Sequence, residues 1–265
     1  MQTKLQEHTE ADMAFRAGRT DRAIRHYQHC LDEYQQNGDV HGVASCTHSL
    51  GTALVYENCP KEGIEALLQA RIAWTGQNRI NEAGRAERDI GVAHMLFRQY
   101  FEANEWLERS RQTLGFSSLH TERGLTEAKK GRLYSLDGEF DLVDGCFDEA
   151  FTLVAQAESP EVVCVVHIDN AFACMERLQW GHMHNHLEAA WQIIHSLGDN
   201  LVRQMLQLTT LNARWLMNNS EWVHAQKLFR EEFVGPITDL SPGMAEVLKR
   251  EVGAGELAEL LLVEI

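Results

Sequence analysis

Three histidines at alternate positions are the side chains best placed to bind a metal. His182, His184 and His186 form a His-x-His-x-His sequence. On a helix, His182 and His186 share one face and His184 points away, because residues four apart lie one turn apart. Two imidazoles need a third ligand, and the neighbouring Asn185 and Glu188 are weak candidates. We expect a solvated polar face here, and we predict no bound metal or other cofactor.

A cysteine–histidine group could in principle support covalent chemistry. Cys164 and Cys174 lie on either side of His167, and Cys164 is one helical turn before it. No orienting acid or oxyanion site accompanies them. The sequence also lacks Gly-x-Ser-x-Gly, P-loop and His-Glu-x-x-His motifs. We therefore predict that the protein is not an enzyme, and that its six scattered cysteines are free thiols.

The composition excludes several classes of partner. The 265 residues include 39 acidic and 24 basic side chains, a formal net charge of −15. Nucleic acids and anionic membranes attract basic surfaces, so this charge argues against both. The chain is 44% hydrophobic and has only four prolines, which favours a globular, helical protein. A polar segment over 1–10 and the lack of a long apolar run predict a cytoplasmic location without a membrane span.

An internal repeat indicates which elements must position these side chains. Small residues recur at a step of 40, with one final step of 42, at Ala11, Gly51, Gly91, Gly131, Ala171 and Ala213. A second small column with the same step contains Cys30, Ala70, Ser110, Ala150 and Ala190. A third, bulky column contains Tyr27, Leu67, Leu107, Phe147, Leu187 and Phe229. A period of this length is typical of helical repeat arrays.

Each repeat has the pattern of a helical hairpin. Residues 124–157 show two runs of apolar residues at helical spacing, separated by Asp137-Gly138-Glu139, whose residue types favour a turn. The small residues at 131 and 150 would let two backbones approach closely. One segment, 162–166, is rich in β-branched residues and could form a strand. Its phase in the 40-residue period favours the first helix of repeat five.

The columns resemble those of tetratricopeptide repeats. The fourth repeat matches best, with Gly131, Tyr134, Gly138, Phe140, Phe147 and Ala150. The tryptophan that the family has early in its first helix is absent throughout, and the 40-residue period is similar to that of a long-helix subclass. The resemblance implies an all-α, right-handed superhelical solenoid of about six hairpins with a C-terminal helical cap. The domain prediction is a repeat array over 1–234, with repeats near 4–43, 44–83, 84–123, 124–163, 164–205 and 206–234.

The remaining residues, 235–265, are predicted to form a linker and capping helices. Gly235-Pro236 is expected to break the helix before them. Ser241 is the expected N-cap of a helix ending near Val252, with Pro242 in its first turn, and residues 256–265 could form a second helix. Four apolar residues are expected to cover the second helix of repeat six: Leu257, Leu260, Leu261 and Val263. Alternatively, this tail could hold two copies of the chain together.

The resemblance also implies a concave surface lined by the first helix of each repeat. The thirty implied lining positions hold five arginines and two acids, whereas the whole chain is acidic. Arginine forks suit carboxylates, and methionine and aromatic side chains supply apolar contact. The predicted binding residues are Arg85, Arg88, Arg132, Arg214, His48, Thr52, Tyr56, Met95, Phe172 and Met175. An alternative is that these arginines pair locally with Glu87, Asp89 or Glu127.

The implied function is binding of another protein or a peptide. The surface departs from the carboxylate clamp of heat-shock co-chaperones, because His8, Asp12, His48 and Thr52 replace its Lys and Asn arrangement. We expect an adaptor or scaffold whose ligand is acidic or bears a carboxylate, together with apolar anchors. The alternative is a regulator that senses a peptide or small ligand and changes conformation on binding.

Overall fold

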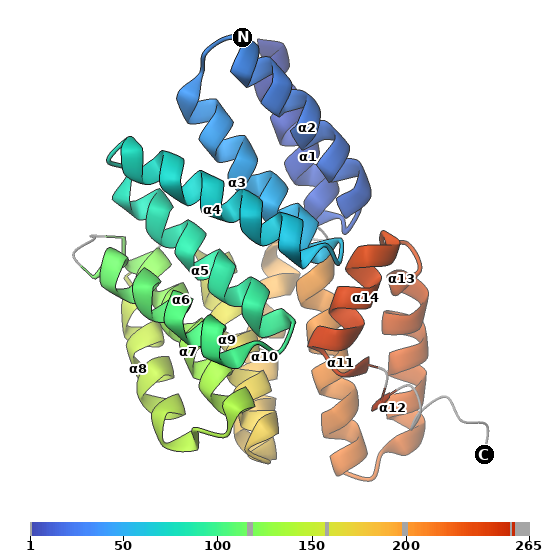
Figure 1. Ribbon diagram of the computed structural model, residues 1–265. Helices are drawn as coiled ribbons and strands as arrows, with labels where there is room; N and C mark the ends of the chain where they lie inside the picture. Colours follow the sequence, from blue (N-terminus) through green and yellow to red (C-terminus); the bar gives the residue numbers. More distant parts are fainter. Residues whose placement is uncertain (1, 116–118, 157–158, 198–200, 255, 258–265) are drawn as a thin grey trace. The chain divides into compact units, whose positions relative to one another are not determined.

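The structure is a computed structural model that describes residues 2–115, 119–156, 159–197, 201–254 and 256–257 (Figure 1). All the regular secondary structure of these residues is helical. Packing divides the chain into two compact units. Unit 1 comprises residues 1–119 and 240–247, and unit 2 comprises residues 120–239 and 248–265. Among the described residues, none of the helices combines the length and the hydrophobicity that a membrane-spanning segment needs.

Three helical hairpins form most of unit 1. Their six helices are α1 (Gln2–Arg16), α2 (Thr20–Gln36), α3 (Val40–Tyr56), α4 (Pro60–Gly76), α5 (Ile80–Leu96) and α6 (Tyr100–Leu114). From α1 to α6, consecutive helices of this unit pack against each other. Pro60 lies at the first position of α4, where no backbone N–H is needed, so it does not interrupt the helix.

Unit 2 contains three further hairpins. Their helices are α7 (His120–Asp137), α8 (Val143–Val154), α9 (Pro160–Glu176), α10 (Trp180–Leu197), α11 (Val202–Asn218) and α12 (Trp222–Phe229). A short 3-10 helix, Phe140–Leu142, leads into α8. The β-branched segment 162–166 is helical, as its phase in the repeat predicts, and the strand alternative is wrong.

The small-residue column lies where paired helices approach most closely, as predicted. A Cβ on Gly51 of α3 would stand 2.9 Å from the carbonyl oxygen of Gly63 on α4. A Cβ on Gly131 of α7 would stand 2.7 Å from the ring of Phe147 on α8. Both distances are shorter than van der Waals contact, so a larger residue would push the helices apart. The all-α fold of about six hairpins is therefore confirmed, and this packing explains its period.

The chain does not break at Gly235-Pro236, which corrects the sequence-based expectation. A π-helix, Arg230–Val234, follows α12 directly and continues into α13 (Gly235–Ile237). The insertion of a wider turn keeps the segment helical, and Pro236 lies at the start of α13, where proline is tolerated. Phe233 of the π-helix is 2% exposed and stacks on Phe229, with ring centroids 4.8 Å apart.

The last described helix is α14 (Pro242–Glu251), which begins as predicted. The backbone N–H of Met244 donates to the Ser241 hydroxyl, which therefore caps the helix. Within unit 1, the Ser241 hydroxyl also donates to Glu57 at 2.7 Å, beside the buried hydroxyl of Thr20. Leu257 is fully buried, whereas Leu260, Leu261 and Val263 lie outside the described residues.

Candidate functional site

The first helices of unit 1 line a polar cavity of about 380 Å³. Its lining side chains come mainly from α1, α3 and α5, with others from second helices and the loop before α5. They are Asp12, Phe15, Tyr27, His41, Ser45, His48, Ser49, Thr52, Trp74, Arg79, Glu82, Arg85 and Asp89. Three of the predicted binding residues, His48, Thr52 and Arg85, are therefore brought together here.

The acidic side chains of this cavity already have partners within the chain. Asp89 accepts from His48 Nε2 at 2.8 Å and from Arg88 Nε at 3.2 Å. Asp12 accepts from the Tyr27 hydroxyl at 2.6 Å. Glu82 accepts from Arg79 Nε at 2.8 Å. These bonds hold the carboxylates against the wall of the cavity.

Two basic side chains, His48 and Arg88, fix Asp89. Burial alone would raise the pKa of Asp89, but the Arg88 guanidinium and the His48 hydrogen bond hold that pKa well below its usual range. Arg88 is 8% exposed, so it acts as a local partner of Asp89, as the alternative interpretation of the arginines expected. Arg85 is exposed and lines the cavity, and its charge also helps to lower the pKa of Asp89.

Unit 2 contains a buried ionic cluster on the first helices α7, α9 and α11. Arg132 Nη1 lies 3.2 Å from Asp169 Oδ1 and 3.1 Å from Glu251 Oε1. Lys129 Nζ donates to Asp169 Oδ2 at 2.7 Å. The three side chains Arg132, Asp169 and Glu251 are at most 4% exposed. The charges of this cluster are thus balanced by one another, with little contact with water.

Glu251 is bound in this cluster much as an acidic ligand would be. Arg203 Nη2 and Gln207 Nε2 both donate to its Oε1 at 2.9 Å, in addition to Arg132. Burial alone would raise the pKa of Glu251, yet Arg203 and Arg132 lower it to about 2. Two residues later, the carbonyl oxygen of Gly253 accepts from Arg214 Nη2 at 3.0 Å.

The other predicted binding residues are distributed between the core and this cluster. Tyr56 and Met95 are 4% and 5% exposed, and Tyr56 packs edge-on against Phe15. Phe172 is also buried, beneath the Arg132 guanidinium, whose central carbon is 4.1 Å from the ring centroid. Met175 is half-buried. Sequence reasoning placed Gln207 among the thirty implied lining positions, but it did not identify Lys129, Asp169, Arg203 or Glu251 as members of a binding cluster.

The groups considered for metal binding and catalysis have other contacts. His186 Nδ1 lies 2.9 Å from His167 Nδ1, and His184 stacks on Trp215 with ring centroids 4.0 Å apart. Among the described residues, no third metal-binding side chain joins His182 and His186. The Cys164 thiol donates to the carbonyl oxygen of Ala190 at 3.7 Å, whereas His167 faces His186.

Comparisons by sequence give no relative: no family model matches the chain, and no curated protein matches it significantly. Solved structures do match. A Podosopora anserina protein with nearly identical TPR-like repeats has a TM-score of 0.53 and 16% identity, over 71% of this chain and 92% of that one. BtubC (BKLC) from P. vanneervenii has a TM-score of 0.58 and 11% identity, over 91% of this chain and 92% of that one. With its paired helices and 40-residue period, the chain therefore has the fold of tetratricopeptide-type repeat proteins.

Proposed function

We propose that this chain is a protein- or peptide-binding adaptor or scaffold, and that its ligand carries an acidic side chain or a free carboxylate. The observation that carries the proposal is the binding of Glu251 by Arg132, Arg203 and Gln207. These three residues project from first helices, and Glu251 lies outside the six hairpins. First-helix side chains of this protein thus supply the guanidinium and amide donors that a carboxylate needs.

The cavity of unit 1 is the proposed site for an external ligand. Arg85 is an exposed arginine on its wall, and Ser45, Ser49 and Thr52 provide hydroxyl groups there. Phe15 and Trp74 contribute aromatic surface for an apolar anchor. Because Asp12, Glu82 and Asp89 are held by partners of their own, they repel an incoming carboxylate less than unpaired acids would.

Selection from a displayed random-peptide library tests this proposal. We expect the selected peptides to be enriched in acidic residues or to bind through a free C-terminus. Arg85→Glu should weaken their binding about tenfold, equivalent to about 1.4 kcal/mol. The matched control is Lys61→Glu, which makes the same charge change at an exposed site on α4 and should leave affinity unchanged. Equal affinities for parent and Arg85→Glu would contradict the assignment to this cavity.

A ligand-sensing regulator is the second candidate function, and the position of Glu251 favours it. An acidic ligand for the Arg132 site would compete with Glu251, since both need the same guanidinium groups. Its binding would release residues 248–257 from the first helices of unit 2. The apparent affinity for the ligand would then depend on the fraction of molecules in which the Glu251 carboxylate has left the site.

Glu251→Gln distinguishes the two candidates. A regulator should bind the selected acidic peptides more tightly in this variant, because the internal competitor has lost its charge. An adaptor that uses only the unit 1 cavity should bind them with the affinity of the parent. Titration calorimetry with the same peptides measures the difference, and circular dichroism checks that the variant remains folded.

A further inference from the structure

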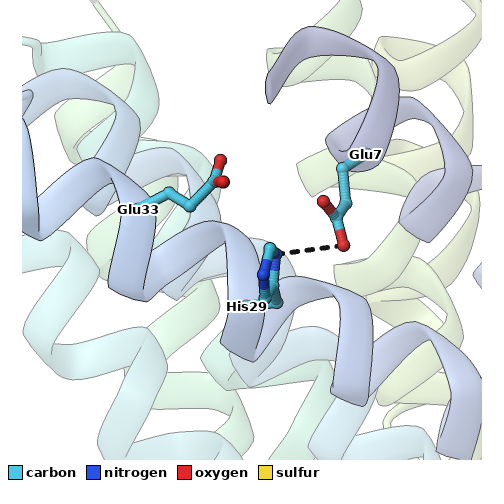
Figure 2. Close-up of side chains that lie close together, drawn as sticks. All are labelled: Glu7, His29 and Glu33. Atoms are coloured by element: carbon cyan, nitrogen blue, oxygen red, sulfur yellow. Dashed lines mark ion pairs between the residues drawn. The ribbon is translucent and has the colours of Figure 1, made fainter. Parts of the chain in front are cut away.

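A cluster of nitrogen and oxygen donors lies on the first hairpin, separate from the cavity and from the ionic cluster. Glu7 of α1 faces His29 and Glu33 of α2, and the dashed line in Figure 2 joins His29 to Glu7. His29 Nδ1 is 3.0 Å from Glu7 Oε1. One candidate ligand atom from each of the three side chains lies within 4.8 Å of the other two.

The spacing along α2 explains why these side chains meet. His26, His29 and Glu33 are three and four residues apart, so they share the face of α2 that is turned toward Glu7. His26 Nδ1 lies 3.6 Å from the same Glu7 oxygen that contacts His29. Arg22 Nε donates to His26 Nε2 at 3.4 Å, so in the neutral ring the proton is on Nδ1 and points to Glu7.

The charge balance of the cluster favours a cation. Among the residues whose side chains the structure describes, which begin at Glu7, no lysine or arginine forms an ion pair with Glu7 or Glu33. The donors that come together here are one imidazole and two carboxylates.

We propose that Glu7, His29 and Glu33 bind a divalent cation of the zinc type, with His26 as a positioning residue for Glu7. Imidazole and carboxylate donors suit Zn²⁺, with bonds of about 2.0–2.2 Å. Tetrahedral ligands then lie roughly 3.3–3.6 Å apart, so the three groups must close by about 1 Å. Rotation of these long side chains provides that movement. His29 is 58% exposed, which leaves an entry path and a position for water.

Titration of the full-length chain with Zn²⁺ at neutral pH, followed by calorimetry, tests the site. We expect one equivalent to bind, and His29→Ala and Glu33→Gln each to weaken binding at least about tenfold. Zn²⁺ should also raise the melting temperature of the parent, because it links α1 to α2. Co²⁺ in place of Zn²⁺ should give visible absorption bands characteristic of a nitrogen–oxygen site.

The matched control is His182→Ala, which removes an exposed histidine from the His-x-His-x-His sequence on α10. This variant should bind Zn²⁺ like the parent. The proposal is overturned if the parent binds no Zn²⁺, if His29→Ala binds as tightly as the parent, or if only His182→Ala loses binding. Circular dichroism confirms folding, which substitution of the exposed His29 should not disturb.

Discussion

His167 and His186 form an imidazole pair that tolerates protonation poorly. Their Nδ1 atoms are 2.9 Å apart, so one neutral ring donates and the other accepts. Phe151 packs against both rings, with centroid distances of 4.8 and 5.8 Å. Burial, and then the neighbouring His186, lowers the pKa of His167 to about 4. Burial also lowers the pKa of His186, and the nearby His182 adds to this effect.

Acidification should therefore destabilise unit 2 through this pair. Between about pH 6.5 and pH 4 the unfolded chain binds more protons than the folded chain, because the pKa of His167 is lower in the folded state. The stability that this pair contributes is complete above pH 6.5 and is lost as the pH falls. Over this pH range, the free energy of unfolding of His167→Gln should fall by roughly 1–2 kcal/mol less than that of the parent. The effect is this small because solvent partly screens the half-buried rings.

Urea denaturation at a series of pH values measures this effect. His224→Gln is the control, because His224 lies on the exposed surface of α12 and its side chain is 72% exposed. The control should keep the pH dependence of the parent. If His167→Gln keeps it as well, the pair is not its source.

Neighbouring first helices place residues about 40 positions apart next to each other. Lys129 pairs with Asp169, 40 residues later, and His48 pairs with Asp89, 41 residues later. Residues of opposite charge about 40 positions apart in the sequence could therefore have predicted part of the ionic cluster. Glu251 had no such signal, because it lies outside the periodic residues and reaches Arg132 only through the tertiary fold.

The turns between paired helices show a similar limit to sequence-based prediction. The residue in each turn has a positive φ, and these residues follow the same period: Gly18, Asn58, Arg98, Gly138, Leu178 and Ser220. Glycine at 138 indicated its turn, but Arg98 and Leu178 carry no turn signal of their own. The 40-residue period could therefore be predicted from the small residues at the helix contacts, but not from the residue types in the turns.

Leu178 should be a strained position that substitution can relieve. Its φ is 58°, and its side chain is 70% exposed, so it gains little from burial. A left-handed conformation costs an ordinary side chain about 1–2 kcal/mol, whereas asparagine tolerates it. We expect Leu178→Asn to raise the free energy of unfolding by about 0.5–1 kcal/mol, measured by chemical denaturation. Leu178→Gln is the control, because it makes the same exposed position polar but glutamine does not share the tolerance of asparagine for a positive φ.

The two units use similar first-helix surfaces differently. Unit 1 has a polar cavity whose acids are held by its own residues, and unit 2 has a buried carboxylate, Glu251, held by three donors. Residues 248–254 and 256–257 therefore contribute polar contacts as well as apolar cover to unit 2. This contribution changes what the C-terminal tail is expected to do, because Phe233 already covers Phe229 of repeat six.

Removal of residues 254–265 should destabilise unit 2 while leaving Glu251 bound. The truncation removes the buried Leu257, whose loss should cost about 2–3 kcal/mol, together with Leu260, Leu261 and Val263. Apolar surface that the tail covers would then be exposed, so the shortened chain should also associate more readily. Chemical denaturation and sedimentation velocity measure the two effects.

Leu257→Ala and a truncation from Glu251 onward separate the polar and apolar parts of this contribution. Leu257→Ala should reproduce most of the loss of stability without removing the rest of the tail. The longer truncation should cost roughly 3–5 kcal/mol more, because it leaves Arg132 and Arg203 without the Glu251 carboxylate in a buried site. If the parent sediments as a dimer and the truncated chain as a monomer, the tail joins two copies. A truncated chain that is as stable and as monodisperse as the parent would refute both roles.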